Sequence, residues 1–280
     1  MESIQRILTQ VQLTRRCQPL RSLRSRALSA LALGALLCSA TACTTTPITG
    51  RQSLNLLSRS EDMQLGEQAY GELLAEAKFI TSGPDYDRVQ DVVARLVEVA
   101  HYSAEFDWEV RLVDDDSVVN AWCLPGGKMA VYTGILPFTQ DATGLAVVMG
   151  HEIGHAIARH GTERMSQQMG VELLLGYISG ELGPEAEQIG AQVANYGVFL
   201  PWGRSQELEA DHIGLMYMAE AGFDPGAAVG FWQRMAGDKG ETSTLEGLAS
   251  THPSSEARIE QIEELLPEAR RIYGRNSARP

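Results

Sequence analysis

The feature that most constrains the fold is the apolar stretch from Gly144 to Gly161, which contains the pattern His-Glu-x-x-His at His151, Glu152 and His155. Its apolar residues recur at helical spacing, so the stretch predicts a buried helix that stops at Gly161. Residues four apart lie on one face of a helix, and both imidazoles can therefore point at a single ion. Zinc requires this convergence, because imidazole nitrogen binds it at about 2.0–2.1 Å.

Glu152 lies beside the two imidazoles without being forced to bind the ion itself. This position suits a general base that acts on a zinc-bound water. The alternative is that two histidines and a glutamate share one helix by chance. Burying imidazole and carboxylate groups in an apolar segment is costly unless they are paired or bound to metal. The pattern therefore favours a metal site.

A catalytic zinc ion needs a third protein ligand, with water completing its coordination. We expect this ligand on a helix that begins near Ser205, because two carboxylates, Glu207 and Asp211, lie on its otherwise apolar stripe. Glu207 would bind the ion, and Asp211 would accept the proton of a ligating imidazole, preferably that of His151. Glu209 is turned by about 200° from Glu207 and is expected to face solvent. The alternative is a rotated helix with both carboxylates exposed.

The first 42 residues have the order of a secretory signal: a basic segment, an apolar run from Ala27 to Leu37, and then small residues. The apolar run is shorter than the about 20 residues that a membrane-spanning helix needs. Ala40-Thr41-Ala42 before Cys43 is similar to a bacterial lipoprotein signal, although alanine replaces the usual leucine. We therefore expect lipid attachment at Cys43 and a location in the bacterial periplasm, with Thr44 favouring the outer membrane. Cleavage and release is the alternative.

Without residues 1–42 the 280-residue chain would keep 238 residues, which suits a tether over 43–52 and a single domain over 53–280. These residues include 17 basic and 35 acidic groups, a net charge of about −18. So acidic a surface argues against nucleic-acid binding and against electrostatic adhesion to anionic lipid. Cys123 is the one cysteine beside Cys43 in this part of the sequence, so no disulfide within the chain is expected.

A change to alternating apolar residues predicts a strand over 108–112, followed by a hairpin that turns at Pro125-Gly126-Gly127. Its first strand contains Asn120, Ala121 and Trp122 and could pair with an extended peptide through main-chain hydrogen bonds. An ordinary hairpin without this role is the alternative. Helices are expected from the N-cap Ser60, after Pro84, over 163–179 and 185–198, and near 255–274.

Several separated motifs are together similar to those of the gluzincin zinc metallopeptidases of metallopeptidase family forty-eight. That group includes HtpX-like proteases, CAAX prenyl proteases and mitochondrial Oma-type proteases. The resemblance covers most of residues 47–262, and the lack of membrane-spanning segments after the signal favours a soluble, lipoprotein-like periplasmic branch. Gly203 departs from relatives that often have serine beside the arginine. The motifs are His151–His155 with Glu207 and Asp211, Asn120–Gly127, Leu200–Arg204 and Ser250–Pro253.

The resemblance implies a zinc-dependent endopeptidase with one zinc ion per chain. We expect an α+β fold, mostly helical, with a small antiparallel sheet beside the His-Glu-x-x-His helix. The expected substrates are misfolded or unassembled envelope proteins, and the oligomeric state stays open. A rival from another class is a non-proteolytic chaperone or assembly factor that keeps the zinc site for structure or in a latent form.

Of the remaining histidines, one is expected near the active site. His252 lies in Ser-Thr-His-Pro, and in some relatives this histidine works at the cleft, either as an extra metal ligand that restrains the enzyme or as an oxyanion donor. Capping of the last helix is the alternative. Arg204 would bind a substrate carboxylate near the cleft or a neighbouring acidic group. His101, His160 and His212 have no ligand spacing and are expected at the surface or in packing.

Overall fold

The chain divides into two units, Met1–Cys43 and Thr44–Pro280. The helices and strands below belong to the second unit, apart from Cys43 at the start of the first strand. In the helix ends 171–179 and 236–237 only the backbone is described. The computed structural model describes residues 43–179, 203–237, 251–252 and 256–277.

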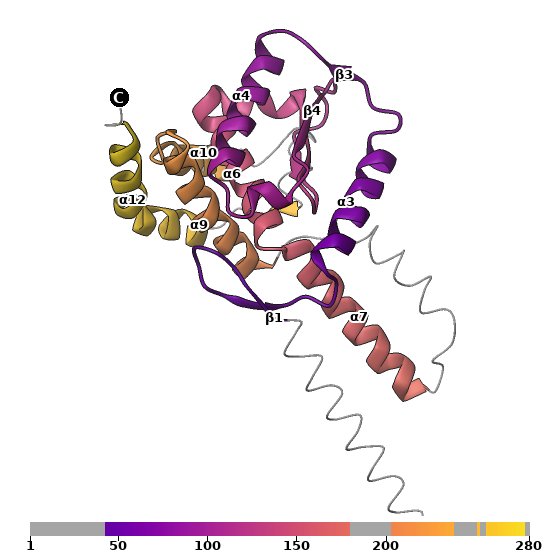
Figure 1. Ribbon diagram of the computed structural model, residues 1–280. Helices are drawn as coiled ribbons and strands as arrows, with labels where there is room; N and C mark the ends of the chain where they lie inside the picture. Colours follow the sequence, from indigo (N-terminus) through magenta and orange to yellow (C-terminus); the bar gives the residue numbers. More distant parts are fainter. Residues whose placement is uncertain (1–42, 180–202, 238–250, 253–255, 278–280) are drawn as a thin grey trace, which may run out of the picture. The chain divides into compact units, whose positions relative to one another are not determined.

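The His-Glu-x-x-His segment forms the central helix of this unit, α6 (Ala142–Ile157). Asp141 caps its start by accepting a hydrogen bond from the backbone N–H of Gly144 at 2.9 Å. Every residue from Gly144 to Ile157 is buried, which explains why apolar side chains occur on all faces of the helix. Helix α6 packs against α4 (Pro84–Val99), α9 (Arg204–Glu220) and the strand β5 (Ala121–Cys123) (Figure 1).

The end of α6 differs from the expected stop at Gly161. The helix ends at Ile157, and Arg159 adopts a left-handed backbone with φ 57°. The next helix, α7 (His160–Ser179), begins directly after Arg159 and contains Gly161. A non-glycine residue in this conformation costs about 1–2 kcal/mol, and the Arg159 side chain is held there by a buried ion pair with Asp62 at 2.7 Å. The turn folds His160 back over the end of α6.

Small residues allow α6 and α9 to approach closely. A Cβ atom added to Gly214 of α9 would lie 2.7 Å from the carbonyl carbon of Gly150 in α6, closer than real Cβ contacts. A Cβ atom on Gly154 would lie 2.8 Å from the carbonyl oxygen of Ala210. With the two backbones this near, Glu207 of α9 reaches the histidines of α6.

A four-stranded sheet with the order β3-β4-β6-β5 places its edge strand β5 beside α6. β5 and β6 form the expected hairpin, and its turn residues Gly126 and Gly127 have φ of 85° and 92°, which glycine adopts without strain. The pairs β3–β4 and β5–β6 are antiparallel, and β4–β6 is parallel. The α+β fold with a small antiparallel sheet beside the helix is thus confirmed, with one parallel pair added. The remaining strand bounds are β3 (Phe79–Ile80), β4 (Glu109–Val113) and β6 (Lys128–Tyr132).

The helix expected from Ser60 has its N-cap at Ser58 instead. Ser58 accepts a hydrogen bond from the backbone N–H of Glu61, whose carboxylate accepts one from the Ser58 backbone, so the two residues form a capping box. The expected helix over 185–198 lies outside the described residues. The other elements are β1 (Cys43–Thr45), β2 (Gln52–Leu54), α3 (Arg59–Leu73), η1 (Ser103–Glu105), η2 (Thr133–Ile135), α5 (Leu136–Thr139), α10 (Ala227–Gly237) and α12 (Glu256–Ser277).

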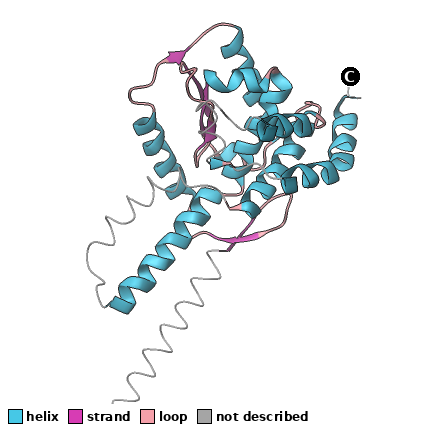
Figure 2. Cartoon of the chain, turned by 180° about the vertical axis from the view of Figure 1, so that it is seen from behind, coloured by secondary structure: helices cyan, strands magenta, loops and turns pink. Residues whose placement is uncertain are grey.

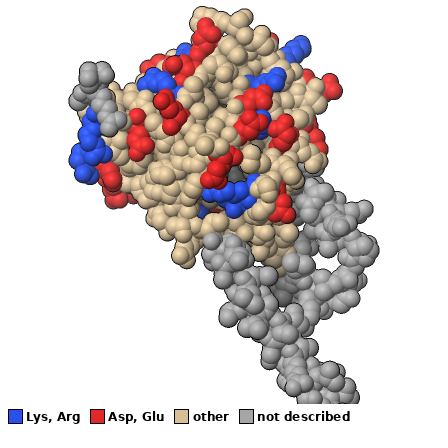
Figure 3. Space-filling model, viewed as in Figure 1, with Lys and Arg blue, Asp and Glu red and all other residues tan. Residues whose placement is uncertain are grey.

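The core is shared by α4, α6, α9, α10, α12 and the sheet, which bury one continuous set of aliphatic and aromatic side chains. Seen from behind, the helices lie on one side of the sheet while α3 lies on the other (Figure 2). In the described part of the chain no helix is both long and apolar enough to cross a membrane. Acidic and basic side chains are interspersed over the face shown in Figure 3.

Candidate metal centre

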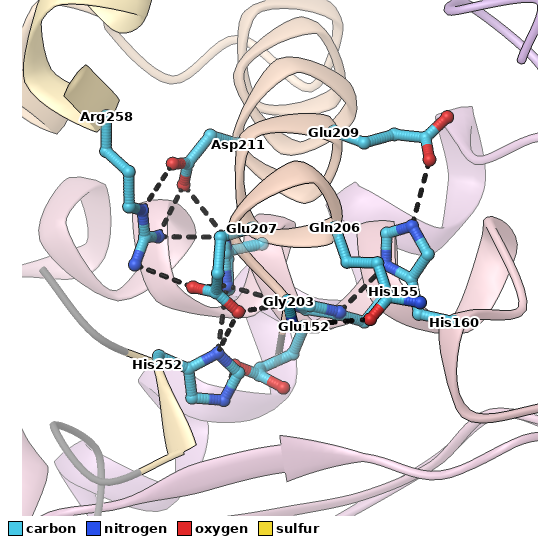
Figure 4. A network of polar contacts seen from close by, with 11 residues as sticks. Glu152, His155, His160, Gly203, Gln206, Glu207, Glu209, Asp211, His252 and Arg258 are labelled. Atoms are coloured by element: carbon cyan, nitrogen blue, oxygen red, sulfur yellow. Dashed lines mark hydrogen bonds and ion pairs between the residues drawn. The ribbon is translucent and has the colours of Figure 1, made fainter. Parts of the chain in front are cut away.

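Four buried side chains bring their ligand atoms together where α6 and α9 meet. They are His151 and His155 of α6, Glu207 of α9, and His252, and each is at most 4% exposed. His151 Nε2 lies 3.0 Å from His155 Nε2 and 3.1 Å from His252 Nδ1. Glu207 Oε1 lies 3.1 Å from His252 Nδ1 and 3.3 Å from His155 Nε2. Figure 4 shows Glu207 and His252 converging on this point.

These distances fit a tetrahedral zinc ion. Zinc–nitrogen bonds of about 2.0–2.1 Å directed to the corners of a tetrahedron separate neighbouring ligand atoms by about 3.3–3.4 Å. The cluster also has the donor chemistry that zinc prefers, three imidazole nitrogens and one carboxylate oxygen. Burial lowers the pKa of His155 well below its usual value, which keeps this ring in the neutral form that binds metal.

Glu207 stays ionised although it is buried. Burial alone would raise the pKa of its carboxyl, but the nearby rings of His151, His155 and His252 outweigh burial and hold the pKa far below its usual range. A negative charge next to three imidazole nitrogens suits a divalent cation. Glu207 therefore occupies the place that the sequence predicts for the third ligand.

Asp211 lies behind His151, as expected from the sequence. His151 Nδ1 donates a hydrogen bond to Asp211 Oδ1 at 2.8 Å, so the ring presents Nε2 to the other ligand atoms. Arg258 of α12 binds Asp211 through Nε at 2.6 Å and Glu207 through Nη1 at 2.7 Å. Its guanidinium lies 3.7 Å from the centre of the Trp232 ring and is 1% exposed.

The sequence analysis missed Arg258. The signal that could have found it is the spacing of Arg258, Ile262, Leu266 and Ala269, all of which are buried on one face of α12. A buried arginine, such as the one on the apolar face of α12, needs acidic partners. The two carboxylates on the apolar face of α9 likewise need a cation. Because nothing in the sequence indicates that α12 lies against α9, the pairing could not be inferred.

Glu152 lies outside the four-residue cluster, with Oε1 at 3.4 Å from Nε2 of His252. Its side chain is buried, and burial raises the pKa of its carboxyl above the usual value. The neighbouring strand β5 carries Cys123, whose thiol pKa is raised first by burial and then by the charge of Glu152. The carboxylate thus lies beside His252 and near enough to Cys123 for its charge to affect the thiol.

Two residues that the sequence analysis placed elsewhere belong to this centre. His160, expected at the surface or in packing, is fully buried with Nδ1 at 2.9 Å from Nδ1 of His155. Glu209, expected to face solvent, is 6% exposed and accepts a hydrogen bond from His160 Nε2 at 3.0 Å. The prediction for Glu209 was wrong because Thr49 and Arg51, far away in sequence, cover that face of α9.

None of the expected substrate-binding residues belongs to the four-residue cluster. Asn120 accepts a hydrogen bond from the Tyr132 backbone N–H, and its side chain accepts one from Ala121. Trp122 packs edge-on against Tyr70 of α3. Among the described strands only β6 pairs with β5, so the other edge of β5 faces away from the sheet. The fourth expected residue, at the start of α9, is the exposed Arg204.

Comparison with known proteins decides the family. A family model described as "Peptidase family M48" matches residues 85–266, a range that includes all four clustered residues. The chain belongs to this family. The matched residues include both the His-Glu-x-x-His helix and the helix with Glu207. The site geometry and the family assignment therefore concern the same part of the chain.

Curated relatives support the assignment. The chain is 38% identical over 226 residues to "Mitochondrial metalloendopeptidase OMA1" of Schizosaccharomyces pombe, covering 80% of this chain and 66% of the relative. It is 33% identical to "Metalloendopeptidase OMA1, mitochondrial" of Homo sapiens, covering 81% and 46%. It is 26% identical to "Beta-barrel assembly-enhancing protease" of Escherichia coli, covering 76% and 45%. The aligned region spans about half the length of several relatives.

These relatives correct the expected location. The proteins of higher identity from two yeasts, human and Arabidopsis are named mitochondrial, whereas the bacterial relatives are 26–27% identical. This contradicts the expected bacterial periplasmic location, and it gives no support to an HtpX-like periplasmic lipoprotein branch. The signal predicted over residues 1–42 lies outside the described residues, and both it and lipid attachment at Cys43 stay predictions.

Proposed function

We propose that this chain is a zinc-dependent endopeptidase in which Glu152 acts as the general base. The observation that carries the proposal is the convergence of His151, His155 and Glu207 beside a buried carboxylate that is outside the ligand set. The printed names of the relatives, which are metalloendopeptidases and proteases, support the same activity.

His151, His155 and Glu207 would hold one zinc ion, with Asp211 fixing the ring of His151. Bound zinc supplies a positive charge that makes a coordinated water more acidic and polarises the peptide carbonyl. The Glu152 carboxylate would take the proton of the attacking water and pass it to the leaving amine. Its raised pKa suits both steps, because a base of moderate strength can also return the proton.

We infer that the substrate is an extended segment of a misfolded or unassembled protein. The edge of β5 that does not pair with β6, in the stretch from Asn120 to Trp122, would supply main-chain hydrogen-bonding groups to the substrate, and such groups bind extended peptides with little regard to sequence. The name of the bacterial relatives, which refers to β-barrel assembly, also supports unassembled proteins as substrates. Arg204 could bind an acidic group of the same segment.

His252 would inhibit the enzyme by occupying the fourth position of the metal centre. Its Nδ1 lies among the ligand atoms, and its Nε2 faces the Glu152 carboxylate at 3.4 Å. A catalytic zinc site normally has three protein ligands and one open position. Activity would then require His252 to leave the cluster, so that water and substrate can enter.

The replacement of Glu152 by glutamine tests this function. Degradation of unfolded casein by the purified zinc-loaded protein should fall by at least about a hundredfold in Glu152→Gln, since general-base catalysis contributes about 10²–10⁴. Zinc content should not change. Glu98→Gln, on the exposed face of α4, should degrade casein like the wild type.

Undiminished casein degradation by Glu152→Gln would reject this mechanism. The rival chaperone function would be favoured if the wild type and His252→Ala both bind zinc and prevent aggregation of unfolded proteins without cleaving them.

A further inference from the structure

We infer that His160 and Glu209 are positioning residues for the metal ligand His155, and that Thr49 and Arg51 of the N-terminal segment complete this support. The inference rests on the proposed zinc site and adds to it a second support for the ligands. It concerns how tightly the metal is held and how the ring of His155 is oriented toward it.

The hydrogen bonds, together with the ring nitrogen that His155 presents to the cluster, define one arrangement of protons. A carboxylate can only accept, so the bond of 3.0 Å between Glu209 and His160 requires a proton on His160 Nε2. His155 presents Nε2 to the other ligand atoms, and a neutral imidazole that binds an ion through Nε2 carries its proton at Nδ1. In the bond of 2.9 Å between the two Nδ1 atoms, His155 is then the donor and His160 the acceptor.

The two histidines of α6 are thus oriented by two carboxylates that both belong to α9. Asp211 binds His151 directly, and Glu209 reaches His155 through His160. The two carboxylates lie on opposite sides of α9. Figure 4 shows Asp211 with Arg258 on one side and Glu209 with His160 on the other. A ligand supported in this way loses less freedom when it binds the ion.

The N-terminal segment keeps Glu209 in place. The hydroxyl of Thr49 donates to Glu209 Oε1 at 2.5 Å, and the Nε of Arg51 donates to Oε2. Arg51 also binds both oxygens of Glu163 in α7, at 2.8 and 2.9 Å. Residues near the start of the described chain are therefore linked to the metal ligand.

Zinc affinity measured against a chromophoric chelator tests the inference without any peptidase assay. His160→Gln and Glu209→Gln should bind zinc about 10–100-fold more weakly than the wild type, the usual effect of losing a partner of a metal ligand. Arg51→Gln should weaken binding in the same direction. His212→Gln, a half-buried histidine of α9 outside this chain of bonds, should bind zinc like the wild type. Circular dichroism of each metal-free variant establishes that it is folded.

Nuclear magnetic resonance of the wild type gives a second test that needs no variant. Long-range ¹⁵N–¹H spectra of the zinc-loaded protein should show His160 protonated at Nε2 and His155 at Nδ1. The opposite state of His160, or unchanged zinc affinity in folded His160→Gln and Glu209→Gln, would overturn the inference. A wild type that binds no zinc would overturn the proposed function itself.

Discussion

The position of His252 makes the clearest prediction at the scale of single residues. Its Nδ1 occupies the ligand cluster and its Nε2 faces Glu152, so removing the ring should open the position that water and substrate need. We expect His252→Ala to degrade casein at least several-fold faster than the wild type while retaining zinc, because His151, His155 and Glu207 remain. Initial rates measured at equal zinc occupancy, with His212→Ala as control, check this expectation.

Slower degradation by zinc-loaded His252→Ala would instead mean that His252 takes part in catalysis, for instance as an oxyanion donor. Equal rates in the variant and the wild type would exclude His252 from both roles.

Local spacing predicted the residues that belong to one motif. His151 and His155 share a helix face, and Glu207 and Asp211 share another, so their convergence followed from helical periodicity and from the ligand number of zinc. His160, Glu209 and Arg258 could not be placed in this way. His160 reaches His155 because Arg159 reverses the chain, and Glu209 is covered by Thr49 and Arg51, which precede it by about 160 residues.

At the scale of elements the site depends on how closely α9 lies against α6. We expect Gly214→Ala to destabilise the fold by about 1–3 kcal/mol, because its Cβ would lie 2.7 Å from the backbone of Gly150 and His151. Pushing α9 outward also moves Glu207 from the two rings, so zinc affinity should fall. Urea unfolding and zinc titration measure both effects.

Gly71→Ala is the matched control for this prediction. Gly71 lies in α3, its added Cβ would meet no atom within 4 Å, and the substitution should stabilise the protein by about 0.4–1 kcal/mol. Equal zinc affinity and stability in Gly214→Ala and the wild type would show that the contact between the two helices is not what fixes Glu207.

Whole elements were predicted more reliably than their ends. The periodicity of the segments that became α4, α6 and α9 marked their buried faces, and Pro125-Gly126-Gly127 marked the hairpin turn. The stop at Gly161 was misplaced because glycine is the usual residue for a left-handed helix end, whereas here Arg159 adopts that conformation and is held by Asp62. Such a contact between distant segments has no local signal in the sequence.

At the scale of the whole molecule, the charged centre links parts of the chain that lie far apart in the sequence. Helices α6, α9 and α12, the loop with His252 and the N-terminal segment each contribute charged or imidazole groups to one buried network. Among the described residues, the Glu207 carboxylate is paired with the buried Arg258 and with three imidazoles. Metal binding should therefore stabilise the assembly of these parts as well as the site.

Thermal unfolding with and without zinc, together with the zinc content of the same samples, tests the central claim most directly. The wild type should hold one zinc ion per chain, and zinc at about 100 times its dissociation constant should raise the unfolding temperature by about 5–10 °C. Glu207→Ala should hold less zinc and show little of this shift. A wild-type protein that stays metal-free after incubation with zinc, or a Glu207→Ala variant with the full shift, would contradict the proposed centre.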